Sequence, residues 1–133
     1  MVVDTSAWVE FLRGTDSPVE KALSRAIRAD EELGVPDVVR LELLAGARSA
    51  EAAGQLARLL ARFVALPAAS PADHEHAAWL YREVRSRGET VRSLIDCLVA
   101  AAALRLDVPL LARDRDYTLI SAVSPLRLST PTR

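Results

Sequence analysis

The sequence predicts an α/β domain in which helices flank a central, mostly parallel sheet. Short apolar runs of strand length alternate with longer segments whose apolar residues recur at helical spacing, and this alternation is typical of parallel sheets. The length of 133 residues suits a single domain. Hydrophobic residues make up 50% of the chain and the net charge is only -1, so the chain can bury a core rather than remain disordered.

The first half of the chain alternates short apolar runs with amphipathic segments. The expected strands cover residues 1–3, 33–35 and 64–66. The expected helices cover residues 5–13, 19–29, 38–47 and 50–62. Thr5 or Ser6 is the expected N-cap of the first helix, and Asp37 that of the third.

The second half begins with two well-signalled helices. Ser70 is the expected cap of a long helix that has Pro71 at its first position and ends near Gly88. Ser93 opens the most apolar helix, over residues 94–106. The remaining elements expected are a strand over 109–112, a helix over 117–122, a strand over 126–128 and a frayed tail over 129–133. We therefore expect one domain over residues 1–133.

Composition and patterning exclude several classes of protein. The single Cys97 excludes a disulfide framework and a cysteine-cluster zinc site. No apolar run reaches the roughly 18 residues that a membrane span needs, and no basic segment precedes an apolar N-terminal stretch. We expect a cytoplasmic protein that is not associated with a membrane.

Four acidic residues stand against their local patterns, and a fifth lies close to one of them in the sequence. Asp4 ends the first strand, and Asp114 follows the strand over 109–112, with Asp116 two residues on. Glu42 lies on the apolar face of its helix, and Asp96 lies in the first turn of the most buried helix, whose N-terminus favours its ionised form. Strand ends and helix starts can converge on one pocket in a parallel α/β domain.

Each of these acids also has a purely structural explanation. Asp4 can be a turn or cap residue, and either Asp114 or Asp116 can cap the following helix. Ser93 with Asp96 resembles a capping box. Glu42 can form an ion pair, for which the candidate partners are Arg40 and Arg48.

Taken together, the acids favour a metal site. Several like charges in one pocket repel one another unless a cation holds them together. Hard oxygen ligands without Cys or His suit Mg²⁺ or Mn²⁺, and one or two such ions can promote cleavage of a phosphodiester. The residues therefore predict metal-dependent phosphoryl chemistry, without choosing a substrate.

Four segments in this order resemble the PIN-domain ribonucleases, most closely the VapC toxins of bacterial toxin–antitoxin pairs. The segments are Val-Val-Asp-Thr-Ser at 2–6, Val-Val-Arg-Leu-Glu-Leu-Leu at 38–44, Ser-Leu-Ile-Asp at 93–96 and Leu-Ala-Arg-Asp-Arg-Asp-Tyr at 111–117. The resemblance covers essentially the whole chain. It implies a PIN-like fold and a Mg²⁺- or Mn²⁺-dependent endoribonuclease in which a metal-activated water cleaves RNA.

The resemblance also implies specific residues and partners. The catalytic and metal-ligating set would be Asp4, Glu42, Asp96 and Asp114, with Asp116 as an accessory ligand and Ser6 as a supporting residue. A VapB-type antitoxin would inhibit the enzyme, its C-terminal segment lying along the toxin and often placing a basic side chain in the acidic pocket. The family forms homodimers, and heterotetramers or larger assemblies with the antitoxin, which alone contacts promoter DNA.

Basic residues flank the acidic segments and are candidates for attracting RNA. They are Arg85, Arg87, Arg92, Arg113 and Arg115. The alternative for each is an ordinary solvated charge at a helix end or in a loop.

Two rival functions remain open at this point. Asp114 to Thr118 reads Asp-Arg-Asp-Tyr-Thr, which matches the Asp-x-Asp-x-Thr loop of haloacid-dehalogenase-like phosphatases. That motif normally opens its fold, whereas only fifteen residues follow Thr118 here and none is a lysine. The other rival is an inactive binding module whose acids hold a structural cation or a basic peptide.

Overall fold

The computed structural model describes residues 1–67 and 70–129 and confirms the α/β fold class. The strands of the described residues form one parallel sheet in the spatial order β3-β2-β1-β4. The strands are β1 (Val2–Val3), β2 (Gly34–Pro36), β3 (Val64–Leu66) and β4 (Leu110–Leu111). The short apolar runs of the sequence are therefore strands, as predicted.

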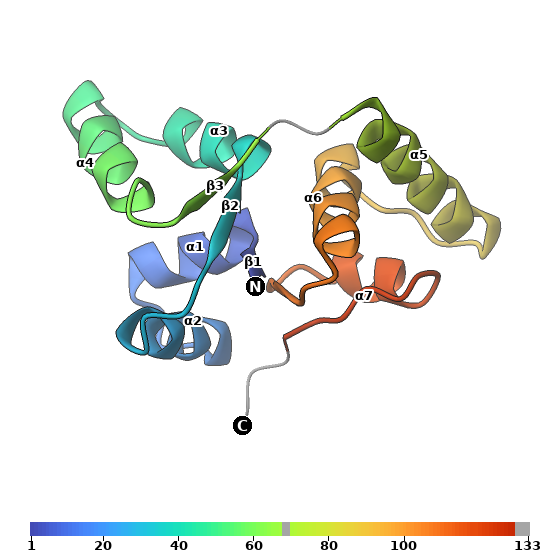
Figure 1. The fold of residues 1–133 in the computed structure, drawn as a ribbon, viewed down its shortest axis with the longest axis horizontal. Coiled ribbons are helices and arrows are strands. Elements are labelled where there is room, and N and C mark those ends of the chain that lie inside the picture. Colours follow the sequence, from blue (N-terminus) through green and yellow to red (C-terminus); the bar gives the residue numbers. More distant parts are fainter. Residues whose placement is uncertain (68–69, 130–133) are drawn as a thin grey trace.

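Helices cover both faces of this sheet (Figure 1). On one side lie α1 (Thr5–Arg13), α2 (Pro18–Arg28), α3 (Asp37–Ala45) and α4 (Ala50–Leu60). On the other side lie α5 (Pro71–Ser86), α6 (Leu94–Leu106) and α7 (Asp116–Ser121). Both faces of the central strands are thereby removed from water, which explains why β1 and β4 read as continuous apolar pairs.

The core is densest where α6 lies between α5 and the rest of the domain. Val99, Ala100, Ala101 and Ala103 of α6 are all fully buried. Alanine side chains allow neighbouring backbones to approach α6 closely. Because α6 is buried on most sides, it is apolar nearly all round rather than along a single stripe.

Three details of the expected fold were wrong. Asp4, rather than Thr5 or Ser6, is the N-cap of α1 because helical geometry begins directly at Thr5. Asp37 is the first residue of α3, and the extended residue before it, Pro36, has no side chain that can cap. The strand expected over 126–128 is a single bridge between Leu128 and Leu110, because β4 is itself only two residues long.

The end of the described chain is attached to the sheet. Ser129, where the expected frayed tail begins, donates its backbone N–H to the carbonyl of Leu110 at 2.8 Å. The rest of that tail, residues 130–133, lies outside the described residues. In the described part of the chain, no helix combines the length and the apolarity needed to cross a bilayer.

The order of the strands creates a crevice at one edge of the sheet. The chain proceeds from β1 outward to β3 and then crosses to β4 on the other side of β1. Val2 pairs with Leu110 and Val3 with Leu111, so the loops after β1 and β4 leave the sheet side by side. Ligands of open α/β sheets bind at such a reversal, beyond the carboxyl ends of the strands.

Candidate active site

Asp4 lies at the carboxyl end of β1, and hydrogen bonds from Ser6 hold its side chain in place. Its Oδ2 accepts hydrogen bonds from the backbone N–H of Ser6 at 3.0 Å and from the Ser6 hydroxyl at 2.7 Å. The Ser6 hydroxyl oxygen also accepts the backbone N–H of Arg113 at 2.9 Å. Ser6, in the first turn of α1, therefore connects Asp4 to the segment that follows β4.

Asp114 and Asp116 lie in the segment that leads from β4 into α7. Asp114 Oδ1 accepts the backbone N–H of Asp116 at 3.0 Å, so Asp114 satisfies a donor at the start of the helix. Asp116 is only 1% exposed. Asp114 thus accepts a hydrogen bond at the start of α7, as the structural alternative proposed. Asp116 is a buried carboxylate, and its negative charge needs a hydrogen-bonding or positively charged partner.

Arg92 is the partner of both carboxylates. Its backbone N–H donates to Asp116 Oδ2 at 2.9 Å, and its guanidinium donates to Asp114 Oδ1 at 2.9 Å. Its Nε also lies 3.6 Å from Asp116 Oδ1. Arg92, a candidate for contacting RNA, thus pairs with Asp114 and Asp116 in this structure.

Asp96 brings the third element into the same site. The Ser93 side chain caps α6 by accepting the N–H of Ile95 at 3.2 Å, which places Asp96 in the first turn. One carboxylate oxygen from each of Asp96, Asp114 and Asp116 lies within 4.8 Å of the other two. The structure therefore gathers three of the expected acids, from two segments of the chain, the start of α6 and the segment that leads into α7.

The electrostatics of Asp96 differ from the sequence-based expectation. Burial, followed by the nearby charges of Asp4, Asp114 and Asp116, raises the pKa of Asp96 to about 7. The helix N-terminus was expected to favour the ionised form, but desolvation and like charges outweigh the helix dipole here. A carboxyl pKa that is raised by nearby acids indicates a site suited to a cation.

Tyr117 links Asp4 to this group and was not singled out from the sequence as a site residue. Its side chain is buried, and its hydroxyl donates to Asp4 Oδ1 at 2.7 Å. The same oxygen lies 3.4 Å from Asp96 Oδ1. Burial and the two carboxylates raise the pKa of the phenol well above its usual value, so it remains a hydrogen-bond donor. The only sequence signal was its position immediately after Asp116.

Glu42 occupies the border of the site. Its Oε1 accepts a hydrogen bond from the Thr5 hydroxyl at 2.7 Å, so it touches the residue next to Asp4. It does not belong to the group of three close carboxylates, and neither Arg40 nor Arg48 forms an ion pair with it among the described residues. A threonine hydroxyl thus satisfies the carboxylate that the sequence placed on an apolar face.

The remaining candidate arginines are all engaged within the chain. Arg113 forms a close ion pair with the buried Glu10 of α1, and Arg115 lies 3.5 Å from Glu89. Arg87 donates to the carbonyl of Ala122 at 3.2 Å. Arg85 stacks over the ring of Tyr81, 5.6 Å from its centroid.

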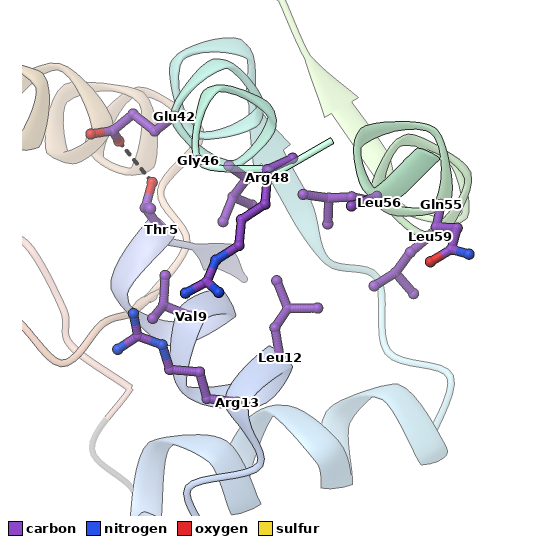
Figure 2. A pocket seen from close by; sticks show the side chains of 13 residues that line it. Thr5, Val9, Leu12, Arg13, Glu42, Gly46, Arg48, Gln55, Leu56 and Leu59 are labelled. Atoms are coloured by element: carbon purple, nitrogen blue, oxygen red, sulfur yellow. Dashed lines mark hydrogen bonds between the residues drawn. The ribbon is translucent and has the colours of Figure 1, made fainter. Parts of the chain in front are cut away.

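A groove of about 570 Å³ runs between α1, α3 and α4 (Figure 2). Glu42 and Thr5 form one end, joined by their hydrogen bond. The lining is largely apolar and includes Val9, Leu12, Leu56 and Leu59. The side chains of Arg13 and Arg48 also line it, and neither forms an ion pair with an acid of the described residues.

The donor set of the acidic site fits a hard divalent cation. Asp96, Asp114 and Asp116 offer only carboxylate oxygens, the ligands that Mg²⁺ and Mn²⁺ prefer. Asp4 is connected to them through Tyr117. The arrangement can therefore hold a metal ion at the crevice between β1 and β4.

Comparison with known proteins identifies similar chains. The family model described as PIN domain matches residues 1–123. Ribonuclease VapC11 of Mycobacterium tuberculosis is 33% identical over 131 residues, which cover 98% of this chain and 98% of the relative. VapC ribonuclease Mb1587 of Mycobacterium bovis matches with the same identity and coverage.

Solved structures share the fold at lower identity. VapBC-1 from nontypeable Haemophilus influenzae aligns with a TM-score of 0.77 and 17% identity, covering 99% of this chain and 98% of that one. VapBC2 from Rickettsia felis, bound to a DNA fragment from their promoter, has a TM-score of 0.74 and 17% identity, with 96% of each chain covered. VapC20 of Mycobacterium tuberculosis, described as a sarcin-ricin loop cleaving toxin, has a TM-score of 0.65 and 22% identity, covering 92% and 94%.

Proposed function

The chain belongs to the PIN-domain family, and from this membership and the acidic site we propose that it is a metal-dependent endoribonuclease, the toxin of a VapBC-type toxin–antitoxin pair. The observation that carries the proposal is the convergence of Asp96, Asp114 and Asp116 beside Asp4 at the crevice of the sheet. Relatives that are one-third identical over nearly their whole length are named ribonucleases. Their name supports RNA as the substrate class.

In the proposed chemistry, some residues would hold the metal ion and others would orient those ligands. Asp4, Asp96, Asp114 and Asp116 would hold Mg²⁺ or Mn²⁺, one or two ions, with Glu42 completing the acidic edge. A cation bound there would act as a Lewis acid toward the phosphate and would make a water more acidic for in-line attack on phosphorus. Ser6 orients Asp4, and Arg92 orients Asp114 and Asp116. Orientation matters because carboxylates that are already in place need little reorganisation when a cation binds.

Substitution of Asp96 by Asn tests this proposal. Asp96→Asn keeps the shape of the side chain and removes its charge, so RNA cleavage should fall by orders of magnitude while the fold persists. The measurement is cleavage of total cellular RNA by antitoxin-free protein with Mn²⁺, with Mg²⁺ and with EDTA. Asp4→Asn should behave in the same way.

The matched control is Asp30→Asn. Asp30 is exposed, lies at the end of α2 and has a left-handed backbone that Asn tolerates, so this variant should cleave like the wild type. Circular dichroism and thermal unfolding show whether each variant is folded. A folded Asp96→Asn protein that still cleaves RNA, or wild-type cleavage that persists in EDTA, would overturn the proposal.

The arginines beside the site remain proposed RNA contacts. Arg92, Arg113 and Arg115 have side chains that are 68%, 59% and 67% exposed although each pairs with an acid. Exposed guanidinium groups around an anionic pocket can draw in phosphates that the pocket itself repels. Arg85 and Arg87 extend the same proposal to the end of α5.

The groove supports the proposed antitoxin partner. An antitoxin segment with apolar side chains would cover Leu12, Leu56 and Leu59, and its acidic residues would face Arg13 and Arg48. The groove ends at Glu42, next to the residue that follows Asp4, so a bound segment can extend a basic side chain toward the acidic site. We propose this groove as the place where a VapB-type antitoxin inhibits the enzyme.

The remaining parts of the proposal concern assembly and location. We propose a homodimer that forms heterotetramers or larger assemblies with the antitoxin, and promoter DNA contact through the antitoxin alone. The similar structures include VapBC-1 from Haemophilus influenzae and VapBC2 from Rickettsia felis, the latter bound to a DNA fragment from their promoter, which supports an antitoxin partner. A cellular RNA substrate implies that the protein acts in the cytoplasm.

A further inference from the structure

Tyr117 places a buried hydroxyl between two carboxylates of the acidic site. It is the second residue of α7 and is 0% exposed. Its oxygen lies 2.7 Å from Asp4 Oδ1 and 3.4 Å from Asp96 Oδ1. An O–H···O hydrogen bond has an optimal length of about 2.7–2.8 Å, so the single proton of the phenol belongs to Asp4.

The two oxygens of Asp4 have different partners. Oδ2 accepts both the N–H and the hydroxyl of Ser6, which belong to the start of the same helix. Among the described residues, Tyr117 is the sole hydrogen-bond donor to Oδ1. The hydrogen bond from the phenol therefore fixes the rotation of the Asp4 carboxylate, and the hydrogen bonds from Ser6 fix its position.

The phenol also couples elements that the sheet alone does not join. Asp4 follows β1, Asp96 lies in α6 and Tyr117 lies in α7, next to Asp116. A shift of α7 thus moves Asp116 and the donor on Asp4 together. Through this contact, the group of Asp96, Asp114 and Asp116 has a defined position relative to Asp4.

We propose that Tyr117 is a positioning residue for the metal site: its hydroxyl holds the Asp4 carboxylate in a fixed orientation beside Asp96, one of the three close acids that would hold the ion. This inference rests on the proposed metal-dependent function. Tyr117 does not itself touch the ion or the substrate. It acts as the outer hydrogen-bonding partner of a ligand, and loss of such a partner typically weakens metal binding about 10-fold to 100-fold.

The test is Tyr117→Phe, which removes one oxygen and retains the ring that fills the core. Mn²⁺ binding to antitoxin-free protein without RNA is measured by calorimetry, and we expect the affinity to fall about 10-fold or more. The matched control is Tyr81→Phe, because Tyr81 is the other tyrosine of the chain and contacts Arg85 away from the acids. The control should bind Mn²⁺ like the wild type.

A spectroscopic readout separates positioning from a merely structural role. Mn²⁺ added to wild-type protein should perturb the near-ultraviolet absorption of tyrosine, because the ion changes the charge on the acceptor of the phenol. The signal should persist in Tyr81→Phe and vanish in Tyr117→Phe. The wild-type titration alone tests the inference if Tyr117→Phe does not fold, since an unperturbed tyrosine spectrum would overturn it.

The outcomes distinguish this inference from the proposed function. If wild-type protein binds Mn²⁺ and Tyr117→Phe binds it equally well, the positioning role is wrong and the nuclease proposal stands. A Tyr117→Phe variant that is less stable without metal but has unchanged Mn²⁺ affinity shows a structural role and also overturns the inference. If folded wild-type protein binds no Mn²⁺, both proposals fail.

Discussion

Asp4 combines a structural role and a proposed chemical role in one side chain. Its Oδ2 caps α1 through Ser6, while its Oδ1 faces Tyr117 and the other acids. Asparagine also caps helices well, because its side-chain oxygen accepts the same N–H. Asp4→Asn is therefore a better test of the site than Asp4→Ala, which would remove the cap together with the charge.

Asp96 makes the stability of the metal-free protein depend on pH. Its folded pKa of about 7 lies above the 3.8 of an unperturbed aspartate, so the folded state binds this proton more tightly than the unfolded state. The stabilisation that this provides is fully present below about pH 4 and is lost as the pH rises to about 7.

Chemical denaturation in EDTA checks this prediction. The unfolding free energy of the wild type should fall between about pH 4 and pH 7 relative to that of Asp96→Asn, which has no proton to lose. Asp30→Asn serves as the control because Asp30 is exposed. If the wild-type and Asp96→Asn curves remain parallel across this range, Asp96 does not titrate as inferred.

At the scale of the elements, an ion pair between a half-exposed arginine and a buried aspartate joins α5 to α6. Asp73 is only 4% exposed, and Arg105 Nε donates to both of its carboxylate oxygens, at 3.2 Å and 2.9 Å. The Asp73 backbone N–H is in turn capped by Ser70. The pair therefore fixes the start of α5 against the last turn of α6, opposite the end of α6 that carries Asp96.

Removal of Arg105 should destabilise this helix pair. Arg105→Met retains most of the apolar stem but leaves a buried carboxylate unpaired, which typically costs about 1–3 kcal/mol of unfolding free energy. Urea denaturation measures the loss. Arg127→Met is the control, because its partner Asp107 is exposed, and we expect a change within about 0.5 kcal/mol.

A second substitution separates the buried charge from the lost packing. Asp73→Leu in the Arg105→Met background removes the orphaned carboxylate and should recover part of the stability. Equal losses for Arg105→Met and Arg127→Met would mean that the ion pair between α5 and α6 contributes no more than a surface pair.

At the scale of the whole molecule, the groove ends next to the residue that follows Asp4. Thr5 and Glu42 line the end of the groove, and Thr5 directly follows Asp4. Both features depend on α1, whose first turn borders the crevice and whose exposed side chains face α3 and α4 (Figure 2). One bound peptide segment can thus cover the groove and approach the acids.

Charge reversal at the rim of the groove tests the antitoxin proposal. Arg48→Glu places a negative charge where we expect an acidic antitoxin residue, so affinity for the cognate antitoxin should fall about 10-fold or more. Arg82→Glu on α5 is the matched control, because Arg82 is exposed and lies outside the groove. Binding is measured by calorimetry with purified antitoxin, and equal affinities for both variants would contradict the groove as the docking site.

Local patterns in the sequence were sufficient for the elements and for naming the acids. Helical spacing predicted α2, and helical spacing with the capping serines Ser70 and Ser93 predicted α5 and α6, because these signals act within a few residues. The acids at the ends of β1 and β4 were identifiable because parallel strands present their carboxyl ends at one edge. The errors at Asp37 and at residues 126–128 arose where the neighbouring strands, not the local sequence, decide where an element begins or ends.

Only the tertiary structure decided which partners each charge would have. Arg92 is 22 residues from Asp114 and its guanidinium binds that acid, and Tyr117 is 113 residues from Asp4, to which it donates. The pKa of Asp96 depends on burial and on three acids from other segments, which outweigh the local helix dipole. The physical reason is that hydrogen bonds, desolvation and charge interactions depend on distance in space, whereas periodicity and capping depend on distance along the chain.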